Sequence, residues 1–284
     1  MEDMTVTGSE AEIQNPPTGG IRIVIAGKGG VGKTTTTAVL AHLFSRDGLK
    51  VLAVDGDPQQ NLAVTLGILE NEVAGIIPVS KSTEYLREKV GAGPDISPGG
   101  LLTLNPDVSD VIDRFSHPVA DNLRLLVMGG VRTAGTGCLC AEYTLLAAIL
   151  RHIPLLPDGI ILLDTPAGME HFGRAVADGF DTALIISDPS WNALSVARES
   201  AALAEQMGIK NRILVVNRSS GRDDTGKFQE LRGKDGHFSR VISLPADPDV
   251  LRFEPGVTPL IGQSSAYMAG MRSLAEIIRQ TGRS

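Results

Sequence analysis

The segment IRIVIAGKGGVGKT occupies residues 21–34. Its first part, Ile21–Ala26, is almost wholly apolar and rich in β-branched side chains, which predicts a buried strand. The next part, Gly27–Thr34, has the spacing G-x-x-x-x-G-K-T, and a helical pattern follows over Thr34–Arg46. Between a strand and a helix, such glycines let backbone N–H groups converge on phosphate oxygens at the positive end of the helix. The segment therefore predicts a phosphate-binding loop.

The polar residues of this loop are expected to contact different parts of a bound nucleotide and its metal ion. We expect Lys33 to neutralise the β- and γ-phosphates and the Thr34 hydroxyl to ligate Mg²⁺. The remaining loop positions expected to contact the nucleotide are Gly29, Gly30, Val31, Gly32 and Thr35. Catalysis at such a site rests mainly on positioning and charge, so the loop predicts an enzyme that hydrolyses a nucleoside triphosphate.

Further apolar runs alternate with helical patterns along the chain. Strands are predicted at Val51–Asp55, Leu123–Met128, Ile160–Asp164, Ala183–Ser187 and Ile213–Asn217, with an edge strand at Val241–Leu244. Helices are predicted at Thr34–Arg46, Ala141–Ile153, Leu194–Met207 and Ala266–Gln280. This alternation predicts a doubly wound, mainly parallel α/β sheet flanked by helices. Residues 67–122 are less regular and are expected to form an excursion near the strand ends.

Composition restricts the class of protein. The chain has 284 residues, of which 42% are hydrophobic, so it can bury a full core. A net charge of −7 argues against a broad nucleic-acid-binding surface, and no run is apolar enough to span a membrane. Two cysteines cannot build a disulfide framework, so we expect a cytoplasmic protein. We also expect a disordered tail over residues 1–20 and a single phosphate-loop domain over residues 21–284.

Lys28 gives the loop the form G-K-G-G-V-G-K-T, which resembles the deviant phosphate loop of the superfamily of nitrogenase iron protein and MinD-like cell-division ATPases. The resemblance implies a homodimer in which Lys28 reaches the ATP of the partner. It also implies that Asp57, after the second strand, positions the attacking water, and that Asp164 holds Mg²⁺ through water. Residues implied to contact the adenine are Asn217, Arg218, Pro245 and Asp247.

Two cysteines separated by one residue, Cys138 and Cys140, precede a predicted helix. Two thiolates supply half of a tetrahedral or square-planar ligand set, whereas a two-fold dimer supplies four. The alternative is a pair of small buried cysteines without a metal.

A narrower resemblance is to the CooC family of ATPases, which assist nickel insertion into carbon monoxide dehydrogenase. It rests on the cysteine pair, on D-G-D-P at residues 55–58, on L-L-V-M-G at residues 125–129 and on D-P-S at residues 188–190. It implies Ni²⁺, or Zn²⁺ at the same thiolates, and carbon monoxide dehydrogenase as the client enzyme.

Two alternative functions remain open. The first is an electron-donating iron–sulfur reductase component, whose second cluster cysteine would fall within Thr165–Phe172, where this chain has none. The second is a spatial regulator of the MinD or ParA type, which binds a membrane or DNA cooperatively and whose membrane form ends in a basic amphipathic helix. The last predicted helix has an apolar stripe but few basic residues, so we expect it to pack into the core. We expect neither a membrane nor a nucleic acid as partner.

Overall fold

The computed structural model describes residues 20–91, 103, 106–129, 140–167, 179–220 and 237–281. The predicted tail therefore lies, apart from Gly20, outside these ranges. In the described residues the strands form one sheet in the order β3-β4-β2-β5-β1-β6-β7-β8. Their bounds are β1 Ile21–Gly27, β2 Lys50–Asp55, β3 His117–Ala120, β4 Leu123–Val127, β5 Gly159–Asp164, β6 Thr182–Ser187, β7 Asn211–Ser219 and β8 Arg240–Pro245. All neighbours are parallel except β3 and β4.

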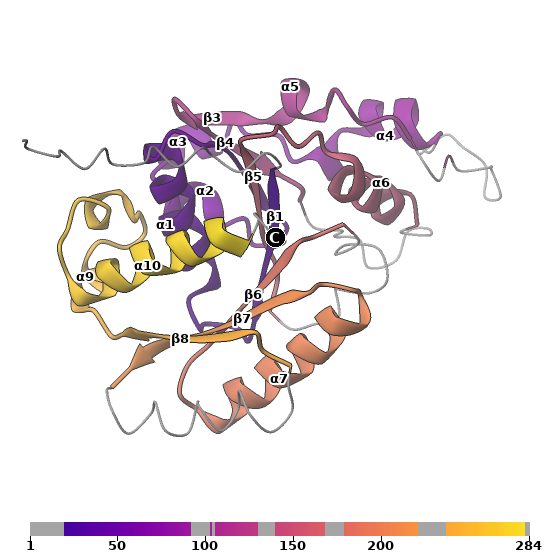
Figure 1. Ribbon diagram of the computed structural model, residues 1–284. Coiled ribbons are helices and arrows are strands. Elements are labelled where there is room, and N and C mark those ends of the chain that lie inside the picture. Colours follow the sequence, from indigo (N-terminus) through magenta and orange to yellow (C-terminus); the bar gives the residue numbers. More distant parts are fainter. Residues whose placement is uncertain are drawn as a thin grey trace, which may run out of the picture.

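Helices cover both faces of the sheet, as Figure 1 shows. The longer helices are α1 Lys33–Arg46, α4 Thr83–Val90, α6 Cys140–His152, α7 Trp191–Gln206 and α10 Ala266–Thr281. Short helical turns are α2 Leu62–Thr65, α3 Glu70–Val73, η1 Val79–Lys81, α5 Val111–Phe115, α9 Pro248–Arg252 and η3 Thr258–Leu260. Helices α1 and α10 pack on one face, and α4, α6 and α7 pack on the other. The predicted doubly wound, mainly parallel α/β fold is confirmed.

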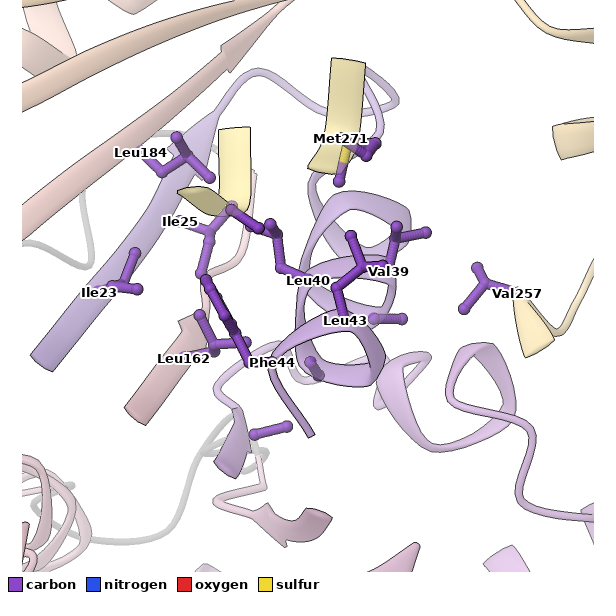
Figure 2. Packing of buried hydrophobic residues seen from close by; sticks show 14 of the residues in the cluster. Ile23, Ile25, Val39, Leu40, Leu43, Phe44, Leu162, Leu184, Val257 and Met271 are labelled. Atoms are coloured by element: carbon purple, nitrogen blue, oxygen red, sulfur yellow. The ribbon is translucent and has the colours of Figure 1, made fainter. Parts of the chain in front are cut away.

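Helix α1, which follows the phosphate loop, is buried on almost all sides. Figure 2 shows its Leu40 and Phe44 directed at β1 and β5, where Ile25 and Leu162 meet them. Met271 of α10 closes the opposite side of the same cluster. A helix buried all round needs no amphipathic pattern, because both of its faces meet apolar partners. The helix that carries the phosphate loop is thus held rigidly by core packing.

Helix α10 places its apolar stripe in this core. Its buried residues are Tyr267, Met268, Met271, Leu274, Ala275 and Ile278. Ile277 is partly buried and packs against the same cluster. The prediction of a core-packed last helix is therefore confirmed. Across the described residues, no helix combines the length and the apolarity needed to cross a bilayer.

The predicted strands and long helices are confirmed to within a few residues at their ends. Among the described residues between 67 and 122, which are 67–91, 103 and 106–122, the structure shows more order than we expected. Helix α4 packs against the sheet face that α6 also covers, through Tyr85, Leu86 and Val90. Strand β3 extends the sheet as its antiparallel edge. This segment is therefore part of the layered structure and not merely an irregular excursion.

Candidate nucleotide site

The phosphate loop leaves the central strand β1 at its carboxyl end and leads directly into α1. Gly27 has a φ of 142°, and a Cβ at this position would overlap the carbonyl oxygen of Ile186 on the neighbouring strand. Only glycine therefore allows the chain to turn here. Within the loop, Lys28, Gly29 and Gly30 are exposed, Val31 is buried, and Gly32, Thr34 and Thr35 are half-buried. The exposed backbone of the loop is available to a ligand.

Lys33, at the start of α1, folds its side chain back over the loop. The side chain is only 7% exposed, and its ammonium donates a hydrogen bond to the carbonyl oxygen of Lys28, with 3.1 Å between nitrogen and oxygen. Burial lowers the pKa of Lys33, while the charges of Asp164 and Asp57 act in the opposite direction. The predicted lysine thus carries its charge at the mouth of the loop, beside both predicted carboxylates.

Asp164 at the end of β5 lies beside the first turn of α1. Its carboxylate accepts hydrogen bonds from the hydroxyls of Thr34, at 2.7 Å, and Thr37, at 3.3 Å. Its exposure is 1%, and burial raises the pKa of Asp164 to about 6, although the Thr34 hydrogen bond and the Lys33 charge lower it. The structure therefore brings together Lys33, Thr34 and Asp164, which the sequence analysis assigned to one site.

Asp55 is a further carboxylate of this site that the sequence analysis did not single out. It ends β2, where it is paired in register with Asp164 of β5, and it is fully buried. Its two oxygens accept the backbone N–H groups of Asp57, at 3.0 Å, and Leu62, at 3.1 Å. Burial, and then the nearby charge of Asp164, raise the pKa of Asp55 to about 7. Asp55 therefore fixes the loop that carries Asp57.

The donor set of this site fits Mg²⁺. Buried Asp164, the Thr34 hydroxyl and half-buried Asp57 offer only oxygen, which Mg²⁺ prefers, whereas both oxygens of Asp55 already accept backbone N–H groups. Asp164 and Asp57 act on the ammonium of Lys33, and burial together with the charge of Asp164 raises the pKa of Asp55, so a divalent cation would offset the excess negative charge. These oxygen donors therefore fit the prediction that Thr34 and Asp164 together hold Mg²⁺.

The residues predicted to contact adenine come from β7 and from the turn after β8. Asn217 is 8% exposed, and its amide nitrogen donates to the carbonyl oxygen of Val31 in the phosphate loop, at 2.9 Å. Arg218 is exposed, and Pro245 is half-buried and paired with Ser219 across the two strands. Asp247 caps α9 through one oxygen, which accepts the N–H of Asp249, while its other oxygen is buried without a partner. Of these residues, Asn217 is the one joined directly to the phosphate loop.

The predicted metal ligands lie largely beyond the described residues. Cys138 falls outside them, and Cys140 is the first residue of α6, with its side chain not described. Within the described ranges, no three His, Cys, Asp or Glu side chains are grouped to hold a metal ion. The cysteine site therefore stays a prediction, located by its backbone at the amino end of α6.

Comparisons with known proteins point to a family of nucleotide-binding domains. The family of CobQ/CobB/MinD/ParA nucleotide binding domains matches residues 22–282. An uncharacterized ATP-binding protein of Methanocaldococcus jannaschii is 40% identical over 234 residues, which cover 82% of this chain and 88% of that protein. The carbon monoxide dehydrogenase accessory protein CooC of Rhodospirillum rubrum is 37% identical over 227 residues, covering 80% of this chain and 84% of CooC. The crystal structure of the cell division ATPase MinD of Pyrococcus furiosus shares the fold, with a TM-score of 0.61 and 19% identity over 92% of this chain and 98% of MinD.

Proposed function

Because the chain belongs to the CobQ/CobB/MinD/ParA family of nucleotide-binding domains, we propose that it hydrolyses ATP and couples this cycle to nickel insertion into carbon monoxide dehydrogenase. The observation that carries the proposal is the 37% identity to CooC over 80% of the chain. The pair Cys138 and Cys140 supports it, because thiolates are soft ligands that suit Ni²⁺. Nickel is here the cargo of the protein.

In the proposed hydrolysis of ATP, the charged side chains around the phosphate loop each have a role. Lys33 binds the β- and γ-phosphates, and Thr34 with Asp164 would hold Mg²⁺, which would supply charge neutralisation at the phosphate oxygens. Asp57 orients a water molecule on the γ-phosphorus, and Asp55 keeps Asp57 in place through its backbone N–H. The water oxygen bonds to the γ-phosphorus as the bond to the bridging oxygen breaks. One water proton stays on the phosphate and the other passes to solvent, so ADP and hydrogen phosphate leave.

The dimer in this proposal is built around the exposed face of the phosphate loop. Lys28 is exposed although its carbonyl oxygen is held by Lys33, so its side chain is free to extend away from its own site. In a two-fold dimer it reaches the phosphates of the partner, and the two cysteine pairs contribute four thiolates to one ion. ATP then closes the dimer, and hydrolysis opens it and releases the metal.

The test is activation of the client enzyme. Nickel-free carbon monoxide dehydrogenase is incubated with Ni²⁺, ATP and this protein, and the recovered oxidation of carbon monoxide is measured. The wild type should raise the recovered activity above that with nickel alone. Lys33→Ala and the double variant Cys138→Ser, Cys140→Ser should lose this gain, whereas Lys50→Ala, an exposed lysine at the opposite end of β2, should keep it.

Two outcomes would contradict the proposal. The first is a wild-type protein that hydrolyses ATP but leaves activation unchanged, which makes it an ATPase with another cargo. The second is a brown protein with a reducible cluster after anaerobic purification, which favours the iron–sulfur reductase component.

A further inference from the structure

The ladder between β7 and β8 is interrupted next to the phosphate loop. The two strands pair regularly up to Val216, and the register then shifts before Ser219 pairs with Pro245. At the interruption Arg218 has a φ of 58°, in the left-handed region that residues other than glycine rarely adopt. Such strain persists only where its surroundings impose it, and it gathers at functional sites. The interruption therefore needs a cause.

The side chain of Asn217 is held at both ends beside this interruption. Its Oδ1 accepts the N–H of Arg218 at 3.0 Å, and its Nδ2 donates to the carbonyl oxygen of Val31 at 2.9 Å. Strand β6 separates β7 from β1, so Asn217 reaches across one strand to the loop that follows β1. The bond is buried. The bulge thus aims an amide of β7 at the backbone of the phosphate loop.

The phosphate loop has a glycine where the Asn217 amide approaches it. Gly32 follows Val31 with a φ of 100°, and a Cβ at Gly32 would lie 2.5 Å from the Asn217 nitrogen. A side chain at this position would be strained by the backbone angle and would also displace the amide. The last glycine of the G-x-x-x-x-G-K-T motif therefore serves the contact with Asn217 as well as the turn.

We infer that Asn217 is a positioning residue that fixes the phosphate loop through its bond to Val31, in addition to its predicted contact with the base. This rests on the proposed binding of ATP. An amide nitrogen has a second N–H and an amide oxygen a second lone pair, so Asn217 can hold the loop and face a base together. Binding of the base then stiffens the loop that holds the phosphates.

The side chain of Asn217 is thus expected to affect nucleotide binding in two ways. Contact with the base discriminates between purines, whereas the bond to Val31 acts on the phosphates of every nucleotide. Purine riboside triphosphate carries hydrogen in place of the adenine amino group, so it offers Asn217 nothing at that position. The affinity for purine riboside triphosphate therefore measures only the effect of Asn217 on the phosphate loop.

The experiment compares Asn217→Asp with the wild type. Aspartate keeps the shape and the acceptor oxygen, but places a carboxylate oxygen against the Val31 carbonyl in place of an N–H donor. The matched control is Asn211→Asp, the same change at the opposite end of β7. Dissociation constants for ATP and for purine riboside triphosphate are measured by calorimetry with Mg²⁺, and unfolding midpoints are recorded without nucleotide.

We expect Asn217→Asp to weaken binding of both triphosphates about tenfold and by the same factor, because a buried carbonyl loses its donor. Asn211→Asp should leave both affinities unchanged. Should Asn217→Asp not fold, Asn217→Ala replaces it, and purine riboside triphosphate must again bind about tenfold more weakly.

Unchanged affinity for purine riboside triphosphate, with or without a loss for ATP, would overturn the inference, because Asn217 then acts on the base alone or on neither ligand. A lowered unfolding midpoint with unchanged affinities would make the contact purely structural. A wild type that binds neither triphosphate would remove the proposed function together with this inference.

Discussion

Asp164 carries a buried charge that its neighbours offset only in part. Its pKa is raised from the ordinary 3.8 to about 6, first by burial, against the hydrogen bond from Thr34 and the charge of Lys33. The folded state therefore binds the proton more tightly than the unfolded state does. It follows that this group lowers the stability of the nucleotide-free protein as pH rises from about 4 through about 6, and that the cost persists above that window.

Asp164→Asn should therefore stabilise the nucleotide-free protein at pH 8, by about 2 kcal/mol, and have little effect near pH 4. The asparagine keeps the volume, and its amide can donate to the Thr37 hydroxyl oxygen. Urea unfolding at pH 4 and pH 8 measures the difference, with the exposed Asp158→Asn as control. An equal shift at both pH values would show that the buried charge is not the cause. The same variant should lose the added stability that Mg²⁺ with ATP gives the wild type.

The role of Asp55 in the site could not be predicted from the sequence. Lys33 and Thr34 are found from the sequence because a motif fixes their order along one turn of chain, and Asp164 because it ends an apolar run. The role of Asp55 depends on its register with Asp164 and on two N–H groups of its own following loop. The pairing with Asp164 joins strands far apart in sequence, and the two N–H bonds depend on how the chain turns after β2. Composition and spacing specify neither.

Among the elements, the central strands were predictable because a parallel sheet covered on both faces selects continuous apolar runs. Strand β3 lacks that signal, since its burial alternates and it contains Pro118, which only an edge strand tolerates. Half of the residues of helix α4 are charged, so its apolar residues did not stand out. Its ends were nevertheless marked by Ser82, whose side chain accepts the N–H of Tyr85, and by the left-handed Gly91.

The carboxyl end of α6 is held by Arg22 of β1, which links the phosphate-loop strand to the helix that begins at Cys140. The guanidinium donates to the carbonyl oxygens of Leu150, at 2.9 Å, and Ile153, at 2.7 Å. Carbonyls at a helix end have no partner within the helix, so the guanidinium replaces water there. Arg22→Met keeps the aliphatic stem and removes these donors.

We expect Arg22→Met to lower the free energy of unfolding by about 2 kcal/mol, because buried carbonyls lose charged donors. Arg46→Met changes an exposed arginine at the end of α1 and should change stability little. Urea unfolding of both variants gives the comparison. If the two variants unfolded at the same urea concentration, water would replace the guanidinium at these carbonyls without loss of stability.

At the scale of the whole molecule, the proposed dimer depends first on Lys28. Because its side chain is exposed and does not serve its own loop, Lys28→Ala should bind ATP with nearly unchanged affinity but dimerise poorly with ATP. Light scattering with a non-hydrolysed ATP analogue measures the dimer, and Lys50→Ala is the control for loss of an exposed lysine. ATP-driven dimerisation that survives Lys28→Ala would remove the cross-subunit role.

The metal provides the second link between two copies of the chain. One chain offers the thiols of Cys138 and Cys140, and two chains offer four, which is the number that a tetrahedral or square-planar ion requires. We therefore expect one divalent ion per dimer. Binding should promote dimerisation, because only the dimer completes the ligand set. Affinity should also rise with pH and release protons, since a thiol must lose its proton to bind.

Equilibrium dialysis with Ni²⁺ and with Zn²⁺, combined with mass measurement, tests this stoichiometry. Either Cys138→Ser or Cys140→Ser should weaken binding strongly, since each removes two of the four thiolates in a symmetric dimer. His152→Ala is the matched control, because it removes an exposed potential ligand at the far end of the same helix. One ion per monomer would mean that each chain completes its site with water or other donors. In that case metal and ATP would not act on the same dimer, and the coupling between hydrolysis and metal release would have to be sought within a single chain.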